Sequence, residues 1–388
     1  MYSVGVVETV RYTYRLRPGV QAGRALDAEW HRCRFLWNEA VHQQKSGRKP
    51  TLCKLSKLLT DARTAHPWLR AGSQVAQQQM LRTYAIALNQ SFKTAGRGRP
   101  TFKAFRKTLP SLEYTTRGFA LTDGRLVLPK GTTIPVVWSR DLPSAPTSVR
   151  VFKDTLGHWY ASFVVRREQA VAPTPDRDGI GVDWGVAATA TTTDPAFDLP
   201  YLGHRARTAA DLATAQRTMS RRRRRGQTPT AGYVRARTLT AKLHKKAARQ
   251  TEHDSRVWAK NVVDHHQLLA VEDFKPKFLA KSTMARKAAD AAIGATKREL
   301  INRGMRAGRT VVLIQPAYTT MTCSRCFARA KLRLELAQRV FTCDGCGYIA
   351  SRDVNSAQLM LKLAECGHTS VDGVRRPVLP TKETPVAA

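Results

Sequence analysis

The sequence predicts a multidomain α/β protein, and three observations support this fold class. Its 388 residues correspond to two or three domains at roughly 150 residues each. Residues 112–167 contain short β-rich runs, whereas the chain beyond residue 178 alternates between apolar strand patterns and helical spacing. Two close cysteine pairs lie within 24 residues of each other, which indicates a small metal-organised unit.

The N-terminal region predicts one strand followed by helices. Apolar and polar residues alternate through residues 1–19, most clearly at Val10, Tyr12 and Tyr14, as is typical of a strand. From residue 20 the apolar spacing becomes helical, and further helices are expected near 52–65 and over 73–95. We therefore assign residues 20–95 to a helical domain.

The next segment, residues 96–107, combines glycine, basic and aromatic residues. This composition suits a flexible segment laid along phosphates, with rings available for stacking. A charged interdomain linker explains it equally well. The candidate nucleic-acid contacts here are Arg97, Arg99, Lys103 and Arg106.

Four β-rich runs follow, at 126–128, 134–138, 148–152 and 159–165. Their even spacing, with turn residues between them, predicts a small β-barrel. The N-terminal strand is expected to join it, because a single strand has nothing else to pair with. The barrel domain would therefore comprise residues 1–19 and 96–172.

A proline-rich stretch at 171–178 marks a boundary, and residues 173–317 are predicted to form an α/β domain. Its strands are expected at 179–193, 267–271 and 310–314, with a long basic helix between the first two. Residues 205–260 hold 16 Lys or Arg against three acids. A solvated helix face is the ordinary explanation, but this concentration of charge favours nucleic acid. The candidate contacts are Arg221, Arg222, Arg223, Arg224, Arg225, Lys245 and Lys246.

The whole chain is strongly basic, with 65 Lys and Arg against 29 Asp and Glu, a net charge of +36. A polyanionic partner is therefore expected, rather than a small-molecule substrate. No apolar run approaches the roughly 18 residues of a membrane span, and the first residues lack the features of a signal peptide. We expect a cytoplasmic protein with no membrane partner.

The cysteine pairs Cys323–Cys326 and Cys343–Cys346 have the spacing of a four-cysteine zinc ribbon over residues 318–350. Two such knuckles let four thiolates reach one tetrahedral Zn²⁺. The alternatives are disulfides or unrelated buried thiols. A site filled by four protein ligands is structural rather than catalytic.

Three acids stand out against their surroundings: Asp183, Glu272 and Asp353. Asp183 lies in an apolar strand flanked by glycines, and Glu272 ends a second apolar strand. Asp353 opens a helix, where ordinary capping would also explain it. Together they match the requirement of two-metal phosphodiester hydrolysis, in which carboxylates from neighbouring elements hold two Mg²⁺ ions.

In combination and in order, these motifs resemble those of the TnpB (OrfB) family, RNA-guided endonucleases of insertion sequences related to type V CRISPR effectors. The resemblance covers nearly the whole chain, and its motifs are YTYRLRP, HRCRFLWNEAV, RPTFKAFRK, GHWYASF, GVDWG, AVEDF, CSRC, CDGC and RDVNSA.

The resemblance implies that Asp183, Glu272 and Asp353 form a RuvC-like, RNase H-type metal site. It also implies that the barrel is a wedge domain and that residues 20–95 form a recognition lobe. The zinc ribbon would be inserted into the RuvC-like domain, which ends with a helix at 351–366. Guide RNA and target DNA, both double- and single-stranded, are the implied partners, in a prokaryotic, nucleoid-associated setting. Residues 367–388 are predicted to be a flexible tail from their composition.

The sequence departs from the family pattern at two positions. Phe327 stands where a glycine usually follows the first knuckle, and Ser351 stands where an acid often precedes the Arg-Asp pair. Neither departure removes an expected metal ligand. Two alternatives remain open: a compact type V effector that uses CRISPR RNA, and an RNA-guided DNA-binding regulator or transposase accessory protein without cleavage.

Overall fold

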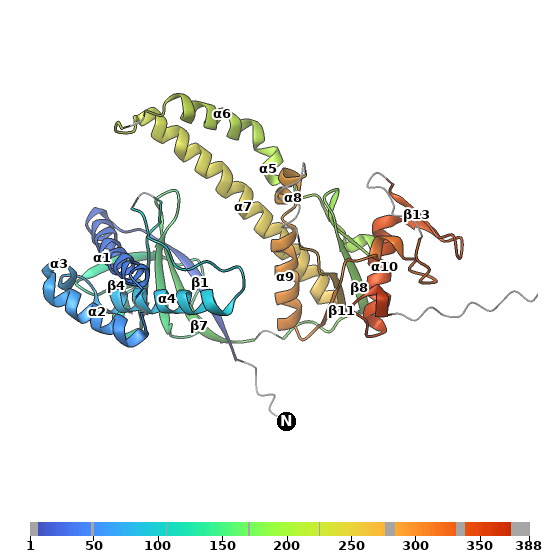
Figure 1. Cartoon of the computed structure of the whole chain (residues 1–388), viewed down its shortest axis with the longest axis horizontal. Coiled ribbons are helices and arrows are strands. Elements are labelled where there is room, and N and C mark those ends of the chain that lie inside the picture. Colours follow the sequence, from blue (N-terminus) through green and yellow to red (C-terminus); the bar gives the residue numbers. More distant parts are fainter. Residues whose placement is uncertain are drawn as a thin grey trace, which may run out of the picture. The chain divides into compact units, whose positions relative to one another are not determined.

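The computed structural model describes residues 7–47, 50–105, 107–169, 171–224, 226–275, 284–330 and 338–373. The chain divides into two compact units, Met1–Gln169 and Ala170–Ala388 (Figure 1). Each has its own hydrophobic core. No helix in these described ranges is long and apolar enough to span a bilayer.

The first unit contains the predicted helices, α1 (Val20–Lys45), α2 (Leu52–Ala65) and α4 (Gln74–Lys93), with a short α3 (Pro67–Arg70). Two of them begin at side-chain caps: Thr51 accepts a hydrogen bond from the Lys54 N–H, and Ser73 accepts one from the Ala76 N–H. The apolar faces of α1 and α4 pack together. There the buried Tyr84 hydroxyl donates to the Ala40 carbonyl at 3.1 Å.

A seven-stranded antiparallel sheet shares this core, in the order β2-β6-β7-β1-β5-β4-β3. Its N-terminal strand lies between β7 and β5, which confirms that it joins the later strands. In the described residues β2 and β3 are the sheet's edges, so closure into a barrel stays a prediction. The strands are β1 (Val7–Leu16), β2 (Ser111–Thr115), β3 (Ala120–Thr122), β4 (Arg125–Leu128), β5 (Thr132–Val137), β6 (Ser148–Lys153) and β7 (Trp159–Glu168).

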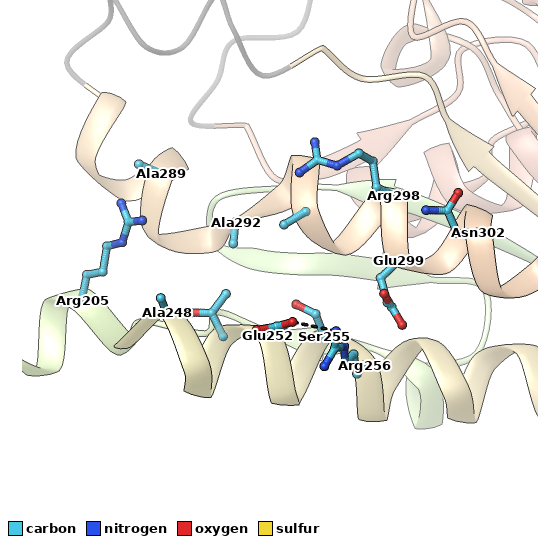
Figure 2. Close-up of a pocket in the computed structure, with 12 residues that line it drawn as sticks. Arg205, Ala248, Glu252, Ser255, Arg256, Ala289, Ala292, Arg298, Glu299 and Asn302 are labelled. Carbon is cyan, nitrogen blue, oxygen red and sulfur yellow. Dashed lines mark ion pairs between the residues drawn. The ribbon is translucent and has the colours of Figure 1, made fainter. Parts of the chain in front are cut away.

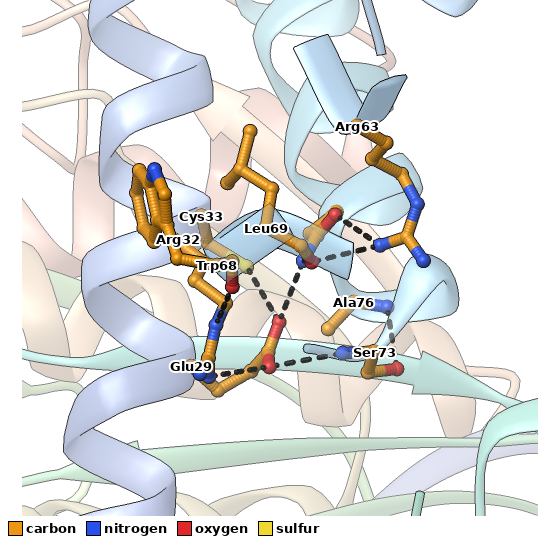
Figure 3. Close-up of polar contacts among 9 residues, drawn as sticks. Glu29, Arg32, Cys33, Arg63, Trp68, Leu69, Ser73 and Ala76 are labelled. Atoms are coloured by element: carbon orange, nitrogen blue, oxygen red, sulfur yellow. Dashed lines mark hydrogen bonds and ion pairs between the residues drawn. The ribbon is translucent and has the colours of Figure 1, made fainter. Parts of the chain in front are cut away.

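A buried carboxylate on α1 fastens this helix to the segment between α3 and α4 (Figure 3). Glu29 accepts from the Ser73 N–H at 3.0 Å and from the Gln77 side-chain amide at 3.4 Å. Arg32 pairs with the same carboxylate at 3.3 Å and donates to the Trp68 carbonyl at 2.7 Å. Burial raises the pKa of Glu29, and these donors partly oppose the rise.

The second unit is built on a five-stranded sheet with the order β10-β9-β8-β11-β12. Its strands are β8 (Arg177–Trp184), β9 (Ala188–Thr192), β10 (Leu199–Pro200), β11 (His266–Glu272) and β12 (Thr310–Ile314). β8, β11 and β12 are parallel, whereas β9 runs antiparallel to β8. The single strand predicted over 179–193 is therefore wrong. It is a hairpin that turns at Gly185, where a Cβ would lie 2.9 Å from the Ala188 carbonyl oxygen.

The basic region between β10 and β11 is a helical hairpin (Figure 1). It comprises α5 (His204–Arg207), α6 (Ala209–Arg221) and α7 (Ala231–His265). The expected helix over 205–260 is thus interrupted, because Gly226 has a φ of +73° and Thr230 caps α7 by accepting from the Tyr233 N–H. The arginine run begins at the last residue of α6 and continues into the connection.

Three helices and a small hairpin complete the second unit. They are α8 (Ala285–Ala291), α9 (Ile293–Arg306), the antiparallel pair β13 (Val340–Thr342) and β14 (Ile349–Ser351), and α10 (Arg352–Glu365). Of the tail at 367–388, residues 374–388 lie outside the described residues.

Candidate acidic site and cysteine cluster

Two glycines on β8 bring helix α10 directly onto this strand. A Cβ at Gly181 would lie 1.9 Å from the Ala357 carbonyl oxygen, and one at Gly179 would lie 2.8 Å from the Leu361 Cδ1 atom. Two residues along a strand and one turn of a helix advance by similar lengths, about 6 Å. Two residues further along β8 and one turn back along α10, the same alignment pairs Asp183 with Asp353, and the charge of Asp353 acts on Asp183.

The neighbouring strand supplies the third acid. β8 and β11 pair in parallel with Val182 opposite Val271, so Asp183 and Glu272 follow at adjacent carboxyl ends. The Trp184 N–H donates to the Glu272 carboxylate at 3.3 Å, and the Trp184 indole N–H donates to the Glu272 carbonyl at 3.2 Å. Three elements distant in sequence therefore bring Asp183, Glu272 and Asp353 to one edge of the sheet.

The three carboxylates interact electrostatically. Burial, together with the charges of Glu272 and Asp353, raises the pKa of Asp183 well above its ordinary value. Burial also raises the pKa of Glu272 to about 7, against the opposing effects of the Trp184 N–H and the nearby ammonium of Lys297. Such a cluster favours either protons or cations, and carboxylate oxygens are the ligands that Mg²⁺ prefers.

Asp353 also faces two guanidinium groups, because Arg339 and Arg352 each approach its carboxylate to 3.7 Å. Asp353 is half-buried, whereas Asp183 and Glu272 are buried. The carboxylate oxygens of the three acids are not gathered around one point as tightly as the cysteine sulfurs. Among the described residues, the only metal-sized group of three or more such ligands is the four cysteines.

Sequence reasoning missed Lys297, a buried lysine on α9 next to this edge. Its ammonium donates to the Asp273 carboxylate at 2.6 Å and to the Phe274 carbonyl at 3.4 Å. Asp273 directly follows Glu272, and its backbone N–H bonds to the Ile314 carbonyl at 2.7 Å. The only signal in the sequence was a lysine on the helix face that carries Ile293 and Leu300, which is weak in a chain with so many basic residues.

The four predicted cysteines form a compact cluster. The sulfurs of Cys323, Cys326, Cys343 and Cys346 all lie within 4.8 Å of one another. Backbone hydrogen bonding from Tyr348 lowers the pKa of the Cys346 thiol to about 7, which favours the thiolate that binds metal. Burial acts in the opposite direction on two other thiols: it raises the pKa of Cys326 to about 12 and also raises that of Cys323. A four-sulfur set of this size suits tetrahedral zinc.

The two knuckles have the same backbone turn. In the first, Phe327 N–H donates to the Cys323 carbonyl at 3.0 Å; in the second, Gly347 N–H donates to the Cys343 carbonyl at 2.9 Å. Both donors have left-handed backbones, with φ of +58° at Phe327 and +71° at Gly347. Phenylalanine at the first position has therefore kept the turn that glycine usually makes.

Two side chains of α10 tie the acid-bearing helix to both knuckles. The fully buried Asn355 accepts from the Ser324 N–H at 2.9 Å and donates to the Thr322 carbonyl at 2.8 Å. The Gln358 side-chain oxygen accepts from the Ser324 hydroxyl at 3.1 Å and from the Tyr348 hydroxyl at 2.8 Å. The cysteine cluster and Asp353 thus share one rigid element.

The predicted nucleic-acid contacts are dispersed over both units. Arg97 and Arg99 are exposed, whereas Lys103 lies over the Trp37 ring at 4.0 Å, and burial lowers its pKa. Arg221, Arg222, Arg223 and Arg224 are exposed at the hairpin end, and Lys246 is exposed on α7 beside the half-buried Lys245. Arg106 and Arg225 lie outside the described residues.

A separate groove of about 440 Å³ runs between α7 and the α8–α9 segment (Figure 2). Its acids are already paired, Glu252 with Arg256 at 2.7 Å and Glu299 with Arg303 at 2.9 Å. Arg298 extends from α9 away from α7 in this view. The groove contains none of the three acids, so it is not the candidate catalytic site.

Comparison with known proteins identifies relatives of this chain. The model of the Cas12f1-like TNB domain matches residues 295–360. A putative RNA-guided DNA endonuclease of Streptomyces pristinaespiralis is 28% identical over 379 residues, covering 94% of this chain and 91% of the relative. The putative RNA-guided DNA endonuclease InsQ of Escherichia coli strain K12 is 25% identical over 376 residues, covering 90% and 91%.

Among solved structures, the chain is similar in fold to Cas12f1 in its complex with sgRNA and target DNA. The TM-score is 0.57 at 11% identity, covering 92% of this chain and 98% of that chain. The chain is thus TnpB-like, and the resemblance drawn from its motifs is confirmed.

Proposed function

We propose that this chain is an RNA-guided, divalent-metal-dependent DNA endonuclease of the TnpB type. The observation that carries the proposal is the approach of α10 to Gly181, which aligns Asp353 with Asp183 beside Glu272. Relatives named as RNA-guided DNA endonucleases span nearly the whole chain, which supports the same activity.

In this proposal Asp183, Glu272 and Asp353 hold the catalytic cations, two Mg²⁺ ions in a RuvC-like site. Bound Mg²⁺ would supply an activated water and neutralise the phosphate charge. The chain's own contribution is positional: the Trp184 N–H orients the Glu272 carboxylate, and Gly181 admits α10. Arg339 and Arg352 hold the Asp353 side chain and add positive charge where a phosphate would approach.

The domain assignments follow from the same resemblance. Residues 1–19 and 96–172 would form the wedge domain, and residues 20–95 the recognition lobe. Residues 173–317 and 351–366 would form the RuvC-like domain, with a Zn²⁺-binding ribbon at 318–350. Guide RNA and target DNA would contact the exposed cations named above, which supply the positive charge that phosphates require.

Substitution of Asp183 by Asn tests the catalytic proposal, because it removes one carboxylate charge with little change in size. We expect cleavage of target DNA to be lost while binding of RNA and DNA is kept. The control is Asp211→Asn, an exposed acid on α6. Cleavage at the wild-type rate by Asp183→Asn would overturn the proposal.

The comparison of Asp183→Asn with Asp211→Asn also tests the alternative of a DNA-binding regulator without cleavage. For such a regulator, neither substitution should change cleavage or the binding of RNA and DNA. Sequencing of the RNA that copurifies with the protein distinguishes the other alternative. Transposon-end RNA supports the TnpB type, whereas repeat-spacer RNA indicates a CRISPR effector.

A further inference from the structure

Three phenylalanines of the first unit are unusually exposed. Phe92 at the end of α4 is 67% exposed, and Phe102 and Phe105 in the following segment are 47% and 59% exposed. We call these three residues the phenylalanine strip. Single exposed apolar side chains are common, so these rings indicate a binding surface only in combination with their surroundings.

The segment that carries two of these rings is held in place by α1. The Trp37 indole N–H donates to the Thr101 carbonyl at 2.9 Å. The Asn38 side chain accepts from the Lys103 N–H at 2.8 Å and donates to the Lys103 carbonyl at 3.3 Å. Lys103 turns inward over Trp37, while Phe102 on one side of it and Phe105 beyond it remain exposed. The two rings are therefore exposed on a backbone segment that hydrogen bonds from α1 hold in place.

Each ring of the strip has a cation over one face, and the His31 ring also stacks on Phe105 with 5.0 Å between ring centres, so a base would stack on the remaining exposed ring surface. The Lys45 ammonium lies 4.6 Å from the Phe102 ring centre. The guanidinium carbon of Arg34 lies 5.2 Å from the Phe105 ring centre, and that of Arg99 lies 5.4 Å from the Phe92 ring centre. Rings that alternate with cations match the two parts of a nucleotide, a flat base and a charged phosphate.

A cavity of about 580 Å³ adjoins Phe92 and Arg99. Leu52 and Leu88 supply apolar lining, and Gln44 and Asn89 supply amide groups. This volume lies within the range of small-molecule pockets, roughly 300–1,000 Å³. Apolar walls with a few amides suit a base, whose edges need hydrogen bonds while its faces need contact.

We propose that unpaired nucleotides of the guide RNA stack on the phenylalanine strip, with one base entering the cavity beside Phe92. This proposal rests on the proposed function for the existence of a guide RNA. An apolar protein partner fits less well, because covering the rings would also bury the charges of Lys45, Arg34 and Arg99. RNA loops offer bases that are already unpaired, whereas a DNA duplex would first have to be opened.

Phe102→Leu tests the strip, since leucine keeps an apolar side chain but lacks a ring face. The probes are a short unstructured RNA with one 2-aminopurine and a fully paired RNA of the same sequence. We expect Phe102→Leu to weaken binding of the unpaired RNA roughly tenfold. It should also reduce the quenching of 2-aminopurine. Phe102→Tyr should restore both.

Binding of the paired RNA and the dependence of affinity on salt should not change, because every cation that could meet a phosphate is retained. The matched control is Ile86→Ala, an apolar residue on α4 that is 51% exposed. Unchanged affinity and quenching in Phe102→Leu would overturn the proposal, and so would an equal loss with paired RNA. A loss confined to single-stranded DNA of the same sequence would overturn the assignment to RNA.

Ultraviolet cross-linking of the wild-type protein to the unpaired RNA gives a second readout that needs no variant. We expect cross-linked nucleotides on the peptide that contains Phe92 to Phe105, and their absence there would also overturn the proposal. Failure of the catalytic proposal is separable. In that case Asp183→Asn would cut normally, while the Phe102 variants would still differ in RNA binding.

Discussion

Lys297 illustrates how much one inconspicuous side chain can contribute to the acidic site. Its ammonium contacts Asp273, the residue after Glu272, at 2.6 Å, and its charge counteracts the effect of burial on the pKa of the Glu272 carboxylate. Lys275 contacts the other Asp273 oxygen at 3.8 Å but is largely exposed. The two lysines therefore form a natural comparison between a buried and a solvated partner.

Lys297→Met should lower the cleavage rate by up to roughly 10-fold, the lower end of the cost of removing an outer-sphere group, because Lys297 contacts Asp273 and acts on Glu272 only through its charge. Lys297→Arg should retain much of the rate, because it keeps the charge. Single-turnover cleavage under saturating RNA measures both. Lys275→Met is the control and should cut like the wild type. If both methionine variants behaved alike, the role of Lys297 would be general charge rather than position.

Glu29 predicts a pH dependence of stability in the first unit, because its pKa is raised from 4.5 in the folded state. Below about pH 4.5 its carboxyl is protonated in both states. Between pH 4.5 and the folded pKa, Glu29 is ionised in the unfolded chain but still protonated in the folded chain, so the free energy of unfolding falls as pH rises. Above the folded pKa the carboxyl is ionised in both states, and the free energy of unfolding levels off.

Glu29→Gln should remove this fall while leaving the rest of the pH profile intact. Urea unfolding of the full chain at a series of pH values, followed by tryptophan fluorescence, measures it. Glu39→Gln, on the same helix but half-exposed, is the control. Parallel profiles for the wild type and Glu29→Gln would contradict the interpretation.

At the level of elements, α10 connects two sites that the sequence suggested separately. Its first turn carries Asp353, and Asn355 and Gln358 are bonded to the residues within and after the knuckles. Zinc binding to cysteines contributes directly to folding in such small ribbons. Metal binding at the cysteine cluster should therefore also stabilise α10, the helix that carries Asp353.

Cys343→Ser should lower zinc content below one ion per chain and increase amide hydrogen exchange along α10. Asn355→Ala should keep the zinc but still increase exchange, because the Ser324 N–H and Thr322 carbonyl lose their partner, at about 1–3 kcal/mol per unsatisfied group. Mass spectrometry measures both quantities. Protection of α10 that survives both substitutions would mean that β8 alone holds the helix.

For the whole molecule, the net charge of +36 predicts nucleic-acid affinity that falls steeply with salt. Replacement of Arg222, Arg223 and Arg224 by Gln should reduce the slope of log affinity against log salt. The reduction should be roughly 0.7–0.9 for each phosphate that the variant no longer neutralises. The matched triple on exposed helix faces of the first unit is Lys54, Lys57 and Arg82. An equal reduction in both triples would mean that total charge, not the hairpin end, decides the affinity.

Much of this architecture follows from local pattern. The helix at 52–65, the strand ending at Glu272 and the cysteine cluster were all predictable, because periodicity, apolar runs and ligand spacing are local signals. The hairpin turn at Gly185 and the break near Gly226 were not, because continuous apolar or basic composition conceals a turn. Lys297 and Asn355 could not be predicted for a different reason, since their importance lies entirely in partners far along the chain.

The fit of α10 against Gly181 also has a consequence for biosynthesis. The strand that carries Asp183 leaves the ribosome long before the helix that carries Asp353, and the first unit is complete by Gln169. Domains fold in the order of their synthesis. A nascent chain would therefore complete the first unit, with the proposed RNA-stacking surface, well before its third acid arrives. Under that proposal, assembly with the guide RNA could begin before the acidic site is complete.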